Sequence, residues 1–433
     1  MLMRSCNKTY TITEYGGFTR GIPACGYQEL PEKTFDALEA FILANSAAGD
    51  EPEALELLSL SVRRGVGKII TVRNYVGLIT MTDGTVIEIL PKIAGEGITV
   101  GETKRIFMGM LKTLKDMTFR DFNVSNLDTD RLGLLEIFIK MFLDEVTILT
   151  KQGLKAAYMP SEANERFYKG KLLASQNIKY NLVSREHFFV RYDDFSVNRP
   201  ENRLIKSTLR FLLNTTDDGG NRRNALRLLS YFNAVEYSAN HDADFSRCAI
   251  DRSMNHYGKA LLWCRVFLKG NSFTTFAGSN VAFALLFPME KVFESYIAAK
   301  FRRHIGSSAN LRTQDKRYSL FDRPTKAFGL CPDIVIEIDG EITVMDTKWK
   351  LLSGNARNYG VSQSDMYQMY AYSKKYNAQK TILLYPMPEN PPGTEIAYHS
   401  DDGVTVALSF IDLLHLDASV QALMQEETSL KQS

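Results

Sequence analysis

The sequence predicts a multidomain α+β protein with a β-rich N-terminal region that also contains helices, a mainly helical middle region and a C-terminal α/β domain. A chain of 433 residues exceeds what one hydrophobic core usually supports, which favours two or three domains. Apolar residues alternate in the N-terminal part, and from about residue 101 they recur every three or four positions. Helical and strand patterns mix near the C-terminus. We therefore expect three regions, 1–160, 161–278 and 279–433.

The composition is typical of a globular protein, with 45% hydrophobic residues, 24% charged residues and a formal net charge of +2. A near-neutral total can hide a basic face, so it does not exclude a nucleic-acid partner. Five cysteines lie far apart without a C-x-x-C pair, which indicates neither a disulfide framework nor a zinc knuckle. No signal peptide is evident, and the longest apolar run is too short to span a membrane. We expect a cytoplasmic protein with no membrane partner.

The N-terminal region is expected to be largely β. Residues 68–93 carry apolar runs on both sides of Asp83-Gly84, a turn dipeptide, which predicts a β-meander or small barrel. A helix is expected over 33–46. Beyond about residue 101 the apolar spacing predicts amphipathic helices, with Gly153 as a helix stop.

The middle region contains a helix that Pro200 can open. Arg203, Lys206 and Arg210 fall on one face of that helix. Two interpretations stay open, a solvated helix face and a track for nucleic-acid phosphates. A segment rich in Gly, Ser and Thr near 270–280 marks the expected boundary with the C-terminal domain.

The C-terminal region contains PDIVIEIDGEITVMDTKWK, residues 332–350, which predicts a β-hairpin closed by a two-residue type I′ turn at Asp339-Gly340. Counting outward from this turn places Asp333 opposite Asp346, and like charges in directly opposed positions destabilise a sheet. A divalent cation removes the conflict, because hard cations such as Mg²⁺ prefer oxygen ligands. Lys348 would point to the same side, where a phosphodiester could bind.

Helices are expected on both sides of this hairpin, because both of its faces carry apolar residues. Glu294 lies at the edge of the buried stripe of the preceding helix. On the following helix, Gln368 and Tyr372 stand at positions i and i+4 of one face, with Asp365 one turn earlier. Glu294 could thus reach the rim of the core.

Together, Glu294, Pro332-Asp333, Asp346-Thr347-Lys348 and the Gln368-x-x-x-Tyr372 motif resemble the PD-(D/E)xK nuclease superfamily in its RecB-like branch. VGLI, IEILPKI, FSVNRPENRLIK, MDTKWK and SQSDMYQMYAY further resemble the McrC family, the nuclease subunit of the McrBC modification-dependent restriction system. The resemblance runs from about residue 70 to about residue 415. Asp346 stands where Glu is commoner, and the superfamily pattern admits either.

The resemblance implies a site for one or two Mg²⁺ ions. Asp333 and Asp346 would hold the metal, helped by the carbonyl of Thr347. Glu294 would complete the acidic cluster, directly or through water. The fold that the resemblance implies for 279–433 is that of a restriction-endonuclease-like nuclease.

The resemblance also implies roles for three further side chains. Lys348 would orient the attacking water or stabilise the phosphorane, while Gln368 and Tyr372 would position the scissile strand or brace the lysine. Tyr372 could equally be a packed aromatic residue. Taken without its neighbours, the pair of Asp346 and Lys348 could be a surface ion pair worth under about 1 kcal/mol.

McrC relatives work with McrB, a ring-forming AAA+ GTPase, so the resemblance implies such a ring and double-stranded DNA containing modified cytosine (5-methylcytosine) as partners. The chain has no P-loop of its own, because VRRGVGKI at 62–69 departs from the required pattern. The N-terminal part would engage the ring and stimulate GTP hydrolysis. Arg63, Arg64 and Lys92 are candidates for that contact by charge.

A basic segment over 300–326 lies next to the expected site in the sequence. We expect it to follow a DNA backbone, with a solvated surface as the alternative. The residues that we expect to bind nucleic acid are Arg302, Arg303, Lys316 and Arg317.

The sequence thus predicts a Mg²⁺-dependent endonuclease subunit activated by a partner GTPase. Two alternatives stay open. The chain could be a catalytically silent adaptor that activates an AAA+ ring, or a RecB-like repair nuclease that acts on DNA ends.

Overall fold

In a computed structural model the contacts divide the chain into two compact units. Unit 1 comprises Met1–Asn7 and Leu135–Asn271, and unit 2 comprises Lys8–Leu134 and Ser272–Ser433. The structure describes residues 8–46, 58–95, 97–114, 129, 131–183, 186–248, 255–269, 281–306, 309–392 and 396–429. The expected boundary segment at 270–280 lies outside the described residues.

The N-terminal part of unit 2 is β-rich, as expected. One sheet has the strand order β3-β2-β5-β4 and a second has the order β1-β7-β6-β11. Their bounds are β1 (Thr9–Thr13), β2 (Gly17–Arg20), β3 (Tyr27–Leu30), β4 (Leu58–Arg63), β5 (Gly67–Val72), β6 (Tyr75–Met81), β7 (Val86–Leu90) and β11 (Val281–Pro288). Helix α1 (Glu32–Ser46) matches the helix expected over 33–46.

Strand β11 joins the two ends of unit 2, because it pairs antiparallel with β6 although about 200 residues of sequence separate them. The chain therefore returns to the N-terminal sheet before it enters the C-terminal α/β fold. Local sequence patterns do not predict this pairing. Helix α3 (Val100–Leu111) also belongs to unit 2 and contacts α10 (Met289–His304).

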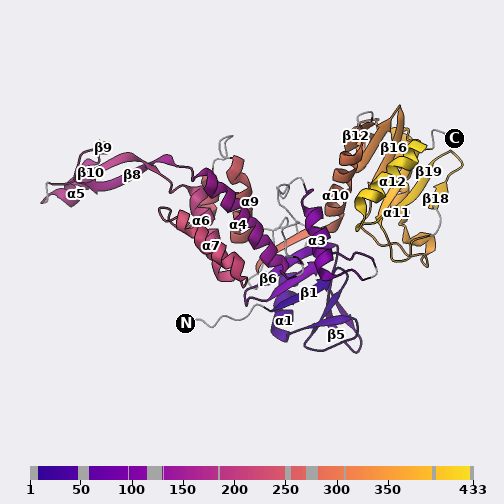
Figure 1. The fold of residues 1–433 in the computed structure, drawn as a ribbon, viewed down its shortest axis with the longest axis horizontal. Helices are drawn as coiled ribbons and strands as arrows, with labels where there is room; N and C mark the ends of the chain where they lie inside the picture. Colours follow the sequence, from indigo (N-terminus) through magenta and orange to yellow (C-terminus); the bar gives the residue numbers. More distant parts are fainter. Residues whose placement is uncertain are drawn as a thin grey trace. The chain divides into compact units, whose positions relative to one another are not determined.

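The C-terminal part of unit 2 is built on a sheet with the order β12-β15-β16-β17-β19-β18. Its strands are β12 (Ala309–Thr313), β15 (Ile334–Ile338), β16 (Glu341–Thr347), β17 (Lys380–Pro386), β18 (Ile396–His399) and β19 (Thr405–Ile411). Helix α11 (Gln363–Tyr376) packs on one face of this sheet, and α10 contacts β16 while α12 (Leu416–Ser429) contacts β19 (Figure 1). The sheet is covered by helices, as the apolar residues on both hairpin faces predicted.

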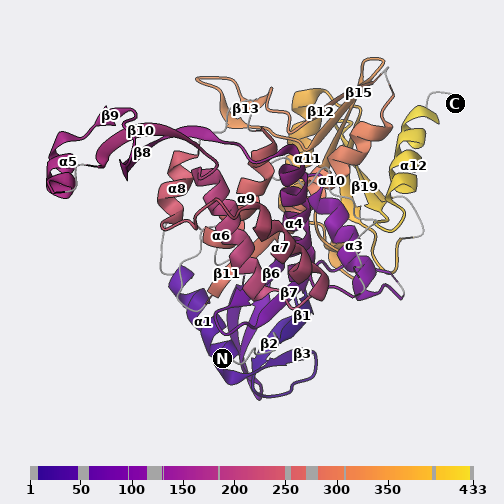
Figure 2. The same ribbon diagram turned by 60° about the vertical axis from the view of Figure 1, so that its left-hand side comes forward.

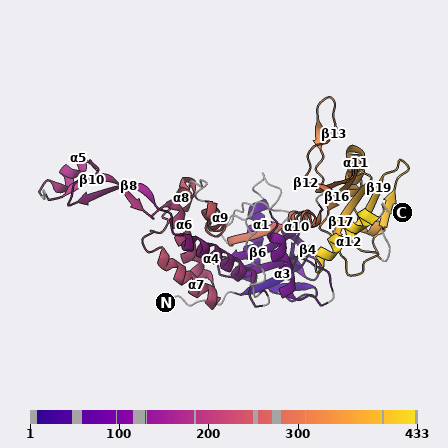
Figure 3. The same ribbon diagram turned by 45° about the horizontal axis from the view of Figure 1, so that its top comes forward.

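The register of the hairpin is the one counted from the sequence. Ile338 faces Glu341 and Ile334 faces Met345, so Asp333 and Asp346 are the next opposed pair beyond the ladder. Asp339 and Gly340 both have positive φ angles, 52° and 87°, as a two-residue type I′ turn requires. Beside the sheet, β13 (Ser319–Phe321) and β14 (Ala327–Gly329) form a short hairpin that projects from the end of β12 (Figure 3).

Unit 1 combines a helical bundle with a long β arm. The helices are α4 (Leu134–Gln152), α6 (Pro200–Thr215), α7 (Gly219–Tyr231), α8 (His241–Arg247) and α9 (Asn255–Lys269), and the arm consists of β8 (Ala157–Glu165), β9 (Lys171–Leu172), α5 (Ala174–Asn181) and β10 (Phe188–Ser196). The arm extends away from the bundle (Figure 2). Helix α4 ends before Gly153, whose φ is 88°, and α6 starts at Pro200, so the predicted helix stop and helix start are both confirmed.

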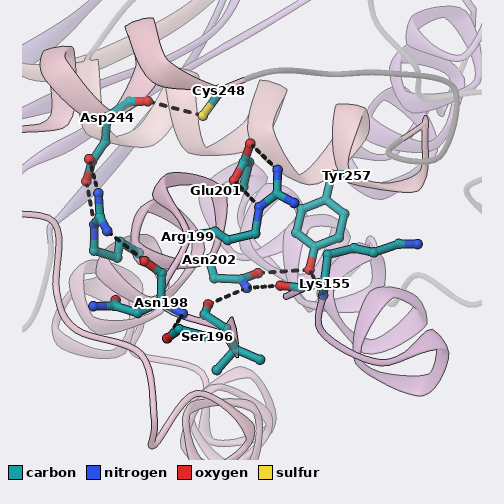
Figure 4. A network of polar contacts seen from close by, with 11 residues as sticks. Lys155, Ser196, Asn198, Arg199, Glu201, Asn202, Asp244, Cys248 and Tyr257 are labelled. Atoms are coloured by element: carbon teal, nitrogen blue, oxygen red, sulfur yellow. Dashed lines mark hydrogen bonds and ion pairs between the residues drawn. The ribbon is translucent and has the colours of Figure 1, made fainter. Parts of the chain in front are cut away.

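A polar network fixes the base of this arm to the bundle (Figure 4). The Asn202 side chain donates to the backbone oxygens of Lys155 (3.0 Å), just before β8, and Val197 (2.7 Å), just after β10. The hydroxyl of Tyr257 donates to the Asn202 side-chain oxygen over 2.8 Å. One buried amide thus connects both arm strands to α9.

The basic face of α6 is used inside unit 1, contrary to both open interpretations. Arg203 makes two hydrogen bonds to the carboxylate of Asp244 and donates to the backbone oxygen of Asn198. Lys206 donates to the backbone oxygen of Val235. Of the three predicted cations, Arg210 is exposed. Most of this face is therefore neither a solvated surface nor a phosphate track.

Across the described ranges, the structure has no helix that is both long enough and apolar enough to cross a membrane.

Candidate active site

Asp333 and Asp346 lie at the open end of the hairpin, side by side on adjacent strands. Asp333 Oδ2 accepts hydrogen bonds from the backbone N–H (2.8 Å) and the hydroxyl (2.7 Å) of Thr347. These bonds hold the carboxylate of Asp333 against the strand that carries Asp346. Thr347 was predicted to offer its carbonyl to a metal; its amide and hydroxyl serve to orient Asp333.

Lys348 connects the carboxylates to α11. Its Nζ lies 2.8 Å from Asp346 Oδ2 and 3.6 Å from Asp365 Oδ1, and it donates to Gln368 Oε1 over 3.1 Å. The Gln368 amide in turn donates to the hydroxyl of Tyr372 over 2.8 Å. The predicted motif therefore forms one continuous chain of contacts, and its geometry favours bracing of the lysine.

Tyr372 is both a packed residue and a member of this chain, since its ring is 2% exposed and its hydroxyl accepts from Gln368. Asp365 is a further acid at the site. Its position one turn before Gln368 was visible in the sequence, although no role was assigned to it.

Glu294 is linked to Asp333 through Gln314, a residue that the sequence did not indicate. The Gln314 amide donates to Glu294 Oε1 and, over 3.0 Å, to Asp333 Oδ1. Gln314 has a φ of 52°, which is uncommon for a residue other than glycine. Among the described residues, no group of three or more acidic, His or Cys side chains lies close enough to hold a metal. Glu294 is therefore a neighbour of the carboxylate pair and is separated from it by an amide.

The carboxylate pair carries more negative charge than its surroundings offset. Burial, with the charges of Asp346 and Glu294, raises the pKa of Asp333 from 3.8 to about 7. Burial also raises the pKa of Asp346, although the ammonium of Lys348 opposes the shift. For Lys348, burial opposes the charged form, but the charges of Asp346 and Asp365 outweigh it and raise the pKa. The single ammonium of Lys348 thus only partly offsets the negative charge of the neighbouring carboxylates.

The donor set fits a hard divalent cation. Asp333 and Asp346 present oxygens from adjacent strands, and a bound cation would offset the repulsion that raises the pKa of Asp333. The hydroxyl of Tyr385 also supports a polar ligand in this region. It is buried without a hydrogen-bond partner in the described part of the chain, and burial, with the charges of Asp365 and Asp346, raises its pKa. A polar group is thus directed into the same region.

The four residues predicted to bind nucleic acid are all exposed. Arg302 donates to the Thr313 hydroxyl over 2.7 Å, and Arg317 pairs with Asp315 over 2.7 Å. Arg303 and Lys316 project from the end of α10 and from the segment after β12. Their role in binding nucleic acid stays a prediction.

A contact between the two ends of unit 2 supports the strand that carries the site. The indole N–H of Trp349, next to Lys348, donates to both carboxylate oxygens of Glu14, over 2.8 and 3.0 Å. Glu14 is 1% exposed, and burial raises its pKa to about 7. The ring of Trp349 packs against Phe293, with 5.2 Å between centroids. Sequence patterns could not reveal a contact between positions this far apart.

A family model described as McrBC 5-methylcytosine restriction system component matches residues 70–386. The chain belongs to this family. It is thus a component of an McrBC restriction system, as the motifs predicted. No curated protein matches the sequence.

Two solved structures from Thermococcus gammatolerans are similar in fold to this McrBC component. A half-complex from a tetradecameric assembly of McrB AAA+ hexamers with bound McrC contains a chain that is 19% identical, with a TM-score of 0.70, over 97% of this chain and 100% of that one. A chain of the McrBC complex is 20% identical, with a TM-score of 0.51, over 69% of this chain and 89% of that one.

Proposed function

We propose that this McrBC component is the Mg²⁺-dependent endonuclease subunit of its restriction system and hydrolyses phosphodiester bonds in DNA containing modified cytosine. The observation that carries the proposal is the pair of facing carboxylates, Asp333 and Asp346. Lys348 follows Asp346 by two residues, at the end of β16, and its ammonium contacts the Asp346 carboxylate. Like charges in this position are unfavourable unless a cation or substrate offsets them.

The residues of the chain would divide the work as follows. Asp333, oriented by Thr347, and Asp346 would hold the metal. Mg²⁺ bound there would lower the pKa of an attacking water and offset charge on the phosphorus. Lys348 would hold a non-bridging phosphate oxygen or orient the water, and its ammonium keeps its direction because Asp346 and Gln368 bind it. Charged groups fixed before reaction need little reorganisation during it.

The proposed partner is an AAA+ GTPase ring that finds the modified base and whose GTP hydrolysis this chain stimulates. The similar solved chains come from assemblies of McrB AAA+ hexamers with McrC. The present sequence lacks a P-loop, so energy for movement along DNA would come from such a ring. Arg63, Arg64 and Lys92 remain the proposed contacts by charge.

The test separates cleavage from partner activation. Asp346→Ala and Lys348→Ala should each reduce cleavage of methylated plasmid to below about one hundredth of the wild-type rate, the lower end of what a positioned catalytic group supplies. Stimulation of GTP turnover in the partner ring should stay unchanged. Arg210→Ala, at an exposed position of α6, is a control for both assays.

Retained cleavage in Asp346→Ala would contradict the site. Stimulated GTP turnover without any cleavage by the wild-type chain would identify an adaptor. Degradation of linear DNA beside intact methylated circles would identify a nuclease that acts on ends.

A further inference from the structure

The β13–β14 hairpin, residues 316–330, carries exposed aromatic rings that neither the fold nor the proposed chemistry explains. Phe321 is 54% exposed and Phe328 is 74% exposed. Their rings contact each other edge to face, with 6.0 Å between centroids. This aromatic pair thus presents an apolar surface outside any core.

The backbone at Phe328 is strained. Its φ is 57°. A bulky residue rarely adopts this left-handed conformation, and the strain lowers the population of the conformation by a factor on the order of ten. Burial does not compensate for the strain at an exposed position. Strain retained in an exposed segment is a common sign of a binding role.

The same hairpin is strongly basic. Lys316, Arg323 and Lys326 are exposed, and no ion pair connects them to another described residue. By contrast, Asp322 pairs with Lys375 over 2.9 Å. The charge around the aromatic pair is therefore positive and available to a polyanion.

The hairpin is attached directly to the candidate active site. The backbone N–H of Gln314 donates to the backbone oxygen of Asp333 over 3.0 Å, and the backbone N–H of Asp315 donates to the backbone oxygen of Pro332 over 3.2 Å. At its other side, Leu330 donates to the Tyr318 oxygen over 2.9 Å. A ligand that contacts the hairpin would be close to the segment that holds Asp333.

We propose that the aromatic pair of the β13–β14 hairpin is a wedge that enters duplex DNA beside the scissile phosphate, while Lys316, Arg323 and Lys326 bind the flanking phosphates. The inference rests on the proposed function for its choice of DNA as ligand. Proteins that bind the minor groove frequently insert apolar side chains such as phenylalanine between base steps, which partly unstacks the bases and bends the duplex. Cations without partners supply the sequence-independent attraction.

The test measures binding without cleavage, using the full chain with Asp346→Asn and a fluorescein-labelled 30-base-pair duplex. Phe321→Ala with Phe328→Ala should weaken binding about tenfold or more at every salt concentration and leave the slope of log Kd against log salt unchanged. Lys316→Gln, Arg323→Gln and Lys326→Gln together should reduce that slope by about 2 to 3. Tyr231→Ala, at an exposed tyrosine of α7 in unit 1, is the control for loss of an exposed ring.

A second measurement reports the wedge itself. A duplex with 2-aminopurine at successive positions should become brighter at one base step when the Asp346→Asn chain binds, and this signal should be absent with the phenylalanine variant. Unchanged affinity together with an unchanged 2-aminopurine signal would overturn the proposal. So would a change in oligomeric mass by sedimentation as the sole effect, because the pair would then join two copies of the chain.

Cleavage of methylated DNA by the chain with native Asp346 is scored separately, in the presence of its partner GTPase ring and GTP. A phenylalanine-dependent signal without cleavage would refute the proposed nuclease and support the wedge. Cleavage together with a 2-aminopurine signal that does not depend on the phenylalanines would support the proposed nuclease and refute the wedge.

Discussion

Two hairpins of unit 2 contain the same Asp-Gly dipeptide and use it differently. At Asp339-Gly340 both residues have positive φ, and the loop contains these two residues. In the β6–β7 hairpin Gly84 has a φ of 87° and Asp83 does not have a positive φ. Thr80 pairs with Val86, and the backbone N–H of Met81 donates to the backbone oxygen of Thr85, so three residues form the loop. One additional loop residue in the β15–β16 hairpin would shift Asp333 away from Asp346.

The two hairpins also differ in how they treat buried acids. Glu88 of β7 is 1% exposed, and its carboxylate lies 3.1 Å from the ammonium of Lys104. It also accepts hydrogen bonds from Thr11 and the backbone of Leu134. In the β15–β16 hairpin the acids outnumber the single lysine. The carboxylate of Glu88 is thus compensated within the fold, whereas Asp333 and Asp346 together are not fully compensated.

The largest effect on stability is expected from Glu88→Ala. This change leaves the ammonium of Lys104 buried without its anion, which typically costs about 3–5 kcal/mol. The free energy of unfolding, measured with urea, should fall by that amount. Glu88→Gln should restore part of it. A loss below about 1 kcal/mol would mean that the ion pair of Glu88 and Lys104 contributes little to stability. The contrast between this compensated acid and the carboxylates of the β15–β16 hairpin would then not hold.

The opposite sign is expected from Asp333→Asn in the absence of metal. The variant removes repulsion and keeps an oxygen that can accept from Thr347, so the free energy of unfolding should rise by roughly 1–3 kcal/mol while cleavage is lost. Asp333→Ala provides the comparison, because it also removes the acceptor. Lower metal-free stability in Asp333→Asn would show that the two carboxylates do not repel each other as inferred.

Burial of Asp333, together with its repulsion from Asp346 and Glu294, also predicts a pH dependence. The pKa of Asp333 is about 7 in the fold against an ordinary value of 3.8, so between these values the folded protein holds a proton that the unfolded chain has lost. Metal-free stability should therefore fall as pH rises from about 4 to 7, by up to about 1.4 kcal/mol per pH unit from this group. Glu14 adds a slope of the same sign, since its pKa is also raised to about 7.

Urea titrations of the wild type and Asp333→Asn at several pH values isolate the contribution of Asp333. The slope should be smaller in the variant, and equal slopes would refute the assignment. Saturating Mg²⁺ should reduce the slope of the wild type, because the bound cation favours the ionised carboxylates.

The smallest effect is expected at the turns. Asp83→Gly removes a hydrogen bond of 2.8 Å from the Thr85 backbone and adds flexibility where φ is ordinary, which should cost about 1–2 kcal/mol. Asp339→Gly should change stability by less than about 0.5 kcal/mol, because glycine relieves the positive φ that aspartate adopts. Equal losses at the two sites in thermal unfolding would show that the turns do not differ as described.

Sequence patterns were sufficient for local features. The type I′ turn fixed the register of Asp333 and Asp346, and helical spacing placed Gln368 and Tyr372 on one face of a helix; that they lie near Lys348 was implied by the family resemblance. These predictions concern residues close in sequence, where period and turn type determine geometry.

The contacts that the sequence did not reveal join distant positions. Gln314 reaches Asp333 and Glu294 because its own φ is positive, and no glycine marks that conformation. Arg203 looked like a surface cation because its partner, Asp244, lies 41 residues away. Such pairs depend on tertiary packing, about which local periodicity carries no information.

The contact between Glu14 and Trp349 limits how this fold can be reused. A fragment cut from the C-terminal half, for fusion to another protein, would leave behind the carboxylate that binds Trp349 and the strand partner of β11. The exposed indole and the unpaired strand would favour aggregation. A fragment that keeps β16 and Trp349 in place must therefore include residues from both the N-terminal and the C-terminal parts of unit 2.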